Sequence, residues 1–131
     1  MPLYRTVVRP GLTDVDTRQA FAGDVVDVHC GATGAPPSLV HVLYVEDDAR
    51  LPDGIDALVF GTIRGGRTGD QKERITTGLT AAFAERAGIS ADAVGVRIAD
   101  IPASYAMEDG EILPEPGSPE EEAWKAGAHA T

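Results

Sequence analysis

The chain has 131 residues, 43% of them hydrophobic, and its formal net charge is -10 at pH 7. This length fits one compact domain, or two half-sized units that share one core. The acidity argues against a nucleic-acid partner, because phosphate contacts need clustered Lys and Arg. No stretch approaches the roughly 18 uninterrupted apolar residues that a membrane span requires. Neither nucleic acid nor a membrane is therefore expected as a partner.

The start of the chain and its few cysteine and histidine residues narrow the class further. The first residues contain no basic segment followed by an apolar run and a cleavage site, so we expect no secretory signal and a cytoplasmic location. The single cysteine, Cys30, cannot form an internal disulfide. The histidines at positions 29, 41 and 129 are scattered without the spacing of metal ligands, so no metal site is expected.

The first part of the chain has the pattern of a β-α-β unit. Residues 4–8 are a short β-branched and aromatic run that ends in a turn, which predicts a strand. Thr13, with Asp16 three residues on, resembles the start of a helix. Apolar residues recur on one face of that helix, namely Phe21, Val25, Val28 and Ala32. Gly34 is placed to end the helix, and residues 39–45 form an apolar run of strand length.

The same order of elements returns in the second part. Residues 57–63 predict a strand, and Thr68 with Gln71 predicts a capping box at the start of a second helix. The inward face of that helix would be Ile75, Leu79, Ala82 and Phe83. Gly88 closes it, and residues 94–99 predict the fourth strand. A second β-α-β unit follows.

The two units have matching spacing, which indicates an internal duplication. Gly34 precedes Val40 by the same interval as Gly88 precedes Val94, so the halves superpose without gaps from helix end into strand. Two such units side by side predict an α/β (α+β) fold with a four-stranded sheet and both helices on one face. The other face is left bare and apolar, so we expect it to pack against other subunits in a closed oligomer.

We expect one domain over residues 1–131. Residues 2–48 and 55–101 are the two β-α-β units, and residues 102–131 form a C-terminal hairpin and tail. Residues 111–113 supply a hairpin strand that subunits could exchange, and the Pro- and Glu-rich end from Gly117 onward is expected to be flexible.

Pro2 is the first candidate for chemistry. Removal of Met1 would leave Pro2 with a free secondary amine, which is both a base and a nucleophile and is held in place by its ring. Burial beside cations would lower its pKa, because both effects disfavour the protonated amine. Most chains that begin with Met-Pro make no chemical use of the proline, so position alone does not establish a role.

Arg64 and Arg67 flank two glycines where the third strand turns into the second helix. Two guanidiniums at a strand end, with the positive end of a helix dipole behind them, can clamp a carboxylate through paired hydrogen bonds. A solvent-exposed basic turn is the plain alternative.

Two further residues are uninformative when taken singly. His29 lies at the edge of the apolar face of the first helix, where a buried structural histidine is the more common case. Glu108 lies in a turn, where a carboxylate is ordinarily solvated, and only a closing active site would use it.

Taken together, these features resemble the tautomerase superfamily, and more narrowly the cis-3-chloroacrylic acid dehalogenase family. The family's Arg-x-x-Arg turn is matched by Arg64 and Arg67, and its Asp-Ala-His by residues 27–29. The tail matches in order and spacing at residues 101–103, 108–110 and 113–117, so the resemblance runs from Pro2 to about Trp124.

The resemblance implies a homotrimer with no metal or organic cofactor and a pocket around the prolyl amine. Arg64 and Arg67 would bind and polarise the carboxylate of a small substrate, and His29 would assist. Glu108 would activate water for attack on an unsaturated acid, and Pro2 would deliver a proton to the neighbouring carbon. In the tautomerases of the superfamily the same amine is instead a general base.

One departure bears on this choice, because Arg97 stands where the dehalogenases have a tyrosine in the fourth strand. An arginine cannot act as a phenol, but it can contact an anionic substrate and lower the pKa of Pro2 if it points inward. We therefore expect tautomerase chemistry on a 2-oxo or enol acid. Because Glu108 is kept, hydration, dehalogenation or decarboxylation of an unsaturated acid is the alternative. A non-catalytic trimer that holds an anionic metabolite is a third reading.

Overall fold

The computed structural model describes residues 1–129. The elements of the main body are β1 (Leu3–Val8), α1 (Val15–Thr33), β2 (His41–Glu46), β3 (Ala57–Arg64), α2 (Gly69–Ala87) and β4 (Val94–Ile101). The tail adds β5 (Met107–Glu108), β6 (Glu111–Ile112) and α3 (Pro119–His129).

The main sheet has four strands in the order β2-β1-β3-β4. β1 pairs with β2 and β3 with β4 in parallel, as the two predicted β-α-β units require. The central pair, β1 and β3, is antiparallel, with Leu3 opposite Thr62. The start of β1 therefore lies beside the end of β3, which brings Pro2 next to the turn that follows Arg64.

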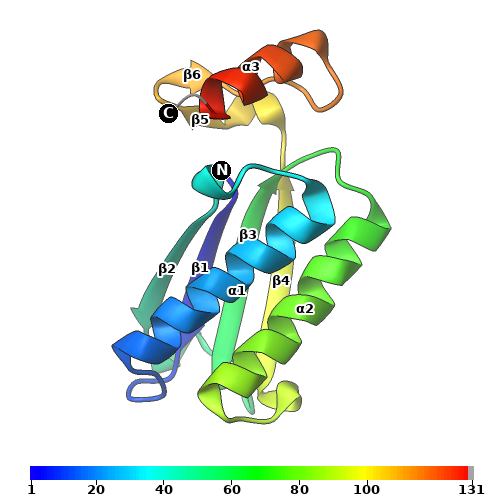
Figure 1. The fold of residues 1–131 in the computed structure, drawn as a ribbon. Coiled ribbons are helices and arrows are strands. Elements are labelled where there is room, and N and C mark those ends of the chain that lie inside the picture. Colours follow the sequence, from blue (N-terminus) through cyan, green and yellow to red (C-terminus); the bar gives the residue numbers. More distant parts are fainter. Residues whose placement is uncertain (130–131) are drawn as a thin grey trace.

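Both helices cover the same face of the sheet, as predicted (Figure 1). Their buried side chains form one core with the strands. In this core the rings of Phe21 of α1 and Phe83 of α2 pack edge to face, with their centroids 4.9 Å apart. The opposite face carries apolar side chains that remain partly open, with Leu43 and Phe60 each 39% exposed. The predicted fold class and layering are confirmed.

The duplication is visible in how the two helices end. Each has 19 residues and stops at a glycine in the left-handed region, Gly34 at φ 73° and Gly88 at φ 67°. A short 3-10 turn follows each glycine, Pro37–Leu39 in the first half and Ala91–Ala93 in the second. The predicted capping box of Thr68 and Gln71 is present.

Two local expectations are wrong. The cap of α1 is Asp14 and not Thr13, because the Asp14 side chain accepts the hydrogen bond from the Thr17 N–H at 2.8 Å. The second strand begins at His41, later than the expected residue 39, because the prolines hold residues 37–39 in the 3-10 turn.

The tail also differs from the expectation. The hairpin forms from β5 and β6, but the segment expected to be flexible from Gly117 folds into α3 as far as residue 129. Ser118 starts this helix by accepting a hydrogen bond from the Glu121 N–H, and acidic residues fill its first turn. Residues 130 and 131 of the same expected tail lie outside the described part.

A membrane-spanning segment was not expected. Within residues 1–129, no helix has both the length and the apolar character needed to cross a bilayer.

Candidate active site

A small pocket lies at the end of the sheet where β1 begins and β3 ends. Its free space is about 20 Å³, which is room for about one water molecule. Its wall includes Met1, Pro2, His29, Arg64, Arg67 and Trp124. The two arginines of the predicted clamp, Pro2 and the predicted histidine therefore share one cavity.

Pro2 is buried at the first position before β1. Its carbonyl oxygen accepts a hydrogen bond from the His41 N–H at 3.0 Å, which fixes the start of the chain to β2. Met1 precedes it, and the Met1 amine forms an ion pair with Oε1 of Glu108. Burial, and next the charge of Arg64, hold the pKa of the Met1 amine below its ordinary value, while the Glu108 carboxylate acts in the opposite direction.

The turn between Arg64 and Arg67 has a shape that only glycine allows. Gly66 has φ +102°, and a Cβ atom there would lie 2.8 Å from Cγ of Pro116 in the tail. The Gly65 N–H donates to the carbonyl of Ile101 at 2.8 Å, which ties the turn to the end of β4. Gly66 thus lets the tail pack directly on the turn.

Arg67 stands just before the N-terminus of α2. It donates to the carbonyl of Thr33 at 3.3 Å, across the gap between the two helices. Burial, and next the charge of Arg64, lower the pKa of its guanidinium. Arg67 is half-buried and lines the pocket.

His29 is only 2% exposed, and its Nδ1 lies 2.7 Å from the Tyr4 hydroxyl. The Tyr4 ring reaches this position because the facing residue is Gly61, whose Cβ would stand 2.6 Å from the ring. Burial, and next the charge of Arg67, lower the pKa of His29 to about 4, so the ring is neutral at pH 7. When the neutral ring accepts a hydrogen bond from the Tyr4 hydroxyl at Nδ1, its own proton is on Nε2, where it can donate to a ligand.

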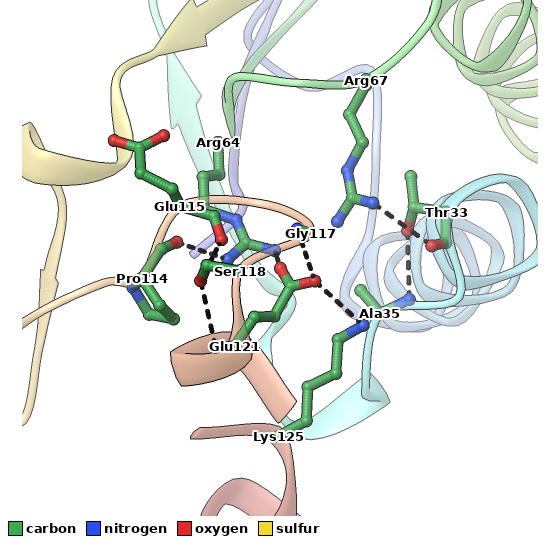
Figure 2. A network of polar contacts seen from close by, with 10 residues as sticks. All are labelled: Thr33, Ala35, Arg64, Arg67, Pro114, Glu115, Gly117, Ser118, Glu121 and Lys125. Carbon is green, nitrogen blue, oxygen red and sulfur yellow. Dashed lines mark hydrogen bonds and ion pairs between the residues drawn. The ribbon is translucent and has the colours of Figure 1, made fainter. Parts of the chain in front are cut away.

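Arg64 is held by the C-terminal tail, as Figure 2 shows. Its guanidinium donates to the carbonyl of Pro114 at 2.9 Å and lies 2.5 Å from Oε2 of Glu121. Its central carbon is 5.3 Å from the centroid of the Trp124 ring. The predicted clamp residue is therefore enclosed by a segment for which the sequence predicted no structure.

Neither Glu108 nor Arg97 lines this pocket, and the two lie in different places. Glu108 lies in β5 and reaches the start of the chain through its contact with the Met1 amine. Arg97 is exposed and pairs with Phe60 across β3 and β4, on the face away from the helices. Arg97 does not line the pocket of its own chain.

Sequence reasoning missed Glu121, Trp124 and Lys125. Trp124 and Lys125 line the pocket, and Glu121 holds its arginine. Two signals were present: Trp124 is the single tryptophan of the chain, and Glu121 and Lys125 have the i,i+4 spacing of a helical ion pair. Within the described residues, no three His, Cys, Asp or Glu side chains are grouped so that they could hold a metal ion.

Comparison with known proteins places this pocket in context. No protein-family model matches the chain, and no curated protein matches it. Among solved structures, native Ps01740 is 35% identical with a TM-score of 0.73, over 81% of this chain and 99% of that one.

Two further structures are similar over almost the whole chain. N1, described as a member of the cis-3-chloroacrylic acid dehalogenase family, is 28% identical with a TM-score of 0.82, over 98% of this chain and 99% of that one. A fused 4-OT, described as a wild-type symmetric trimer, is 22% identical with a TM-score of 0.76, over 95% of this chain and 98% of that one. At 22% identity, the similarity to the fused 4-OT concerns the fold alone.

Proposed function

The chain belongs to the tautomerase superfamily, and from this membership and the pocket around Pro2 we propose that it is a tautomerase acting on a small 2-oxo or enol carboxylic acid. Pro2 is the base in this proposal. The reaction requires that Met1 be removed, so that the prolyl nitrogen becomes a free secondary amine in the pocket wall.

The proton transfers follow from the placement of the groups. The substrate carboxylate binds the guanidinium of Arg67, beside that of Arg64, and the Nε2 proton of His29 supports it. The neutral amine of Pro2 takes the proton of the enol hydroxyl as the carbonyl bond forms. The protonated amine then returns a proton to the adjacent carbon, which yields the 2-oxo acid and restores the neutral base.

One observation carries this proposal: Pro2 is buried in a pocket that also contains two arginines. Desolvation and nearby positive charge both destabilise a protonated amine, so both lower the pKa of a terminal amine at this place. The same two causes already lower the pKa of the Met1 amine, which stands one residue farther out. A neutral amine at pH 7 is a proton acceptor.

Glu108 favours a second candidate function. Its carboxylate contacts the amine of Met1, the residue directly before Pro2. There it would activate a water molecule to attack an unsaturated acid, while a protonated Pro2 would protonate the neighbouring carbon. That hydratase or dehalogenase chemistry needs Pro2 as an acid. Arg97 would disfavour this chemistry if it pointed inward and lowered the pKa of Pro2. Within a single chain it lies outside the pocket, so that argument against the hydratase does not apply.

The bare sheet face supports assembly into a homotrimer. Its exposed apolar side chains, including Leu43 and Phe60, would be buried there, and a fused 4-OT of the same fold is a symmetric trimer. Arg97 lies on this face, so in a trimer it would meet a neighbouring subunit.

Ketonisation of an aryl enol pyruvate tests the proposal. We expect turnover by the wild type, with kcat/KM rising as pH rises through the pKa of Pro2. Pro2→Ala should lower kcat/KM at least about 100-fold, because a positioned general base contributes about that much. Pro10→Ala, in the exposed turn after the end of β1, is the matched control and should keep full activity.

Three outcomes would redirect the assignment. An active Pro2→Ala protein would overturn the role of proline. Turnover of an acetylenic or halogenated acrylate without ketonisation would replace the tautomerase by the hydratase. Intact-mass measurement showing that Met1 is retained would point to the non-catalytic binding protein.

A further inference from the structure

The strongest feature outside the proposed chemistry is a buried carboxylate at the pocket wall. The side chains of Arg64 and Glu121 are 6% and 8% exposed, and Nη2 and Oε2 are 2.5 Å apart. The contact is a close, buried ion pair. Figure 2 shows both side chains between the turn and α3.

Glu121 is ionised in this position. Burial opposes its ionisation, but the hydrogen bond from the Gly117 N–H and the charges of Arg64 and Lys125 outweigh burial, and the pKa of the carboxyl falls below its ordinary value. The Gly117 N–H donates to Oε1 at 3.2 Å, and Lys125 lies 3.4 Å from the same oxygen.

The cations of the pocket are therefore not equivalent. Arg64, Arg67 and Lys125 all line it, but the single carboxylate of Glu121 contacts two of them. Among the described residues, no carboxylate lies within ion-pair distance of Arg67. Arg67 is thus a guanidinium without an ion-pair partner among the described residues, and it stands beside Arg64, which Glu121 faces at 2.5 Å. Lys125 shares the Glu121 carboxylate at the longer distance of 3.4 Å, and the charge of Glu121 acts on Arg67 only from farther away.

We infer that Glu121 is a positioning residue that sets the charge of the ligand: it holds and neutralises Arg64, so the pocket prefers acids with one carboxylate over acids with two. This inference rests on the proposed function for its substrate class. One carboxylate of the ligand binds Arg67. A second carboxylate of the ligand would lie near Glu121. The two negative charges would repel each other, because the protein interior screens charge weakly.

A pair of ligands of equal chain length isolates this effect. 2-Oxopentanoate and 2-oxopentanedioate share the 2-oxo acid head and differ in a terminal methyl or carboxylate group. Trp124 is the only tryptophan and lines the pocket, so its fluorescence reports binding of either ligand without turnover. The dissociation constants of both are measured on the full chain with Met1 removed.

Three variants accompany the wild type. Glu121→Gln removes the charge but keeps an oxygen that can accept from the Gly117 N–H. Glu121→Asp keeps the charge, and Glu122→Gln removes a charge from the same turn of α3 at an exposed side chain.

We expect the wild type to bind the monoacid more tightly than the diacid. In Glu121→Gln, the ratio of the dissociation constant of the diacid to that of the monoacid should fall about tenfold, which is the size of one partly screened charge contact. In Glu121→Asp and Glu122→Gln the same ratio should stay within about twofold of the wild-type value, because both variants keep a negative charge at position 121.

Several results would overturn the inference. These are a preference in Glu121→Gln equal to that of the wild type, equal narrowing in Glu121→Asp, or loss of both ligands in Glu121→Gln. The proposed function fails separately. A protein that shows this charge selectivity but no proton transfer contradicts only the function, and one that turns over enol acids with unchanged selectivity in Glu121→Gln contradicts only the inference.

Discussion

The two ends of the main sheet carry an arginine ion pair each, but only one of them is covered. At the pocket end, the pair of Arg64 and Glu121 lies under the C-terminal tail with both side chains less than a tenth exposed. At the other end, Arg9 after β1 pairs with Asp56 before β3 at 3.3 Å, with the side chains 50% and 35% exposed.

The difference between the ends shows what the tail contributes. Exposed ion pairs add little stability, and buried ones often cost as much in desolvation as they return in attraction. A buried pair is therefore weak evidence of a purely structural role. Burial at the pocket end instead places charged groups where they can interact strongly with a ligand. The two ends are built from the same strands and differ chemically in this respect.

The largest expected effect is on the buried pair itself. Arg64→Met leaves Glu121 without its main partner, so the free energy of unfolding should fall by about 3 kcal/mol, whereas Arg9→Met at the exposed pair should cost about 1 kcal/mol or less. Urea unfolding of both variants measures this. Equal losses at the two ends would contradict the comparison.

The buried histidine at the pocket end should make stability depend on pH. The pKa of His29 is about 4 in the folded protein and ordinarily 6.5, so the unfolded chain binds more protons between these values. The stabilisation is present above pH 6.5 and is lost as pH falls toward 4, by roughly 3 kcal/mol in all.

Unfolding free energies between pH 7 and pH 4 test this dependence. The decline should be shallower in His29→Gln than in the wild type, and unchanged in His41→Gln, whose side chain is exposed. A decline of the same steepness in His29→Gln would show that other groups cause it.

The hydroxyls of one buried and one half-buried tyrosine allow a comparison of the two ends. The hydroxyl of Tyr4 bonds His29 at the pocket, and that of Tyr44 donates to the carbonyl of Arg18 near the start of α1. Each Tyr→Phe change should cost about 1 kcal/mol of stability. Only Tyr4→Phe should also lower kcat/KM, by about tenfold, because it removes the hydrogen bond that orients His29, the ring proposed to support the substrate carboxylate.

Enol-acid kinetics and thermal unfolding on the two proteins distinguish these effects. If Tyr44→Phe lowered kcat/KM as much as Tyr4→Phe, His29 would have no special role in the pocket.

The helix caps give the smallest expected effect. Asp14 caps α1 at the far end and Thr68 caps α2 at the pocket, so Asp14→Ala and Thr68→Ala should each cost about 1 kcal/mol in chemical unfolding. Thr68→Ala should also raise KM, because Arg67 directly precedes the cap. A rise in KM for Asp14→Ala would show that the far end also communicates with the pocket.

Local chemistry explains which parts of the fold could be predicted from the sequence. The Thr68 box and the glycines at 34 and 88 act within a few residues, so their patterns were sufficient. The cap of α1 was misplaced by one residue because Thr13 and Asp14 are both good caps, and the prediction chose the wrong one of the two.

The tail could not be predicted in the same way. Its many Glu and Pro residues resemble a solvated segment, and the order of α3 depends on distant contacts of Glu121 and Trp124 with Arg64. Pro2, His29 and the arginine pair were recognisable because they follow a family pattern. That Arg64 would already have a carboxylate partner depended on a contact between residues 57 positions apart, which no local spacing encodes.

The most direct test of the central claim is a pH titration of the Pro2 nitrogen, followed by nuclear magnetic resonance on protein labelled with ¹⁵N-proline and with Met1 removed. A base in a desolvated, cationic pocket should titrate below the ordinary α-amino range of about 7.7 to 8.0. The midpoint should rise toward that range in Arg64→Met. A Pro2 amine that stays protonated well above pH 8 would contradict the account and favour the acid role of the hydratase chemistry.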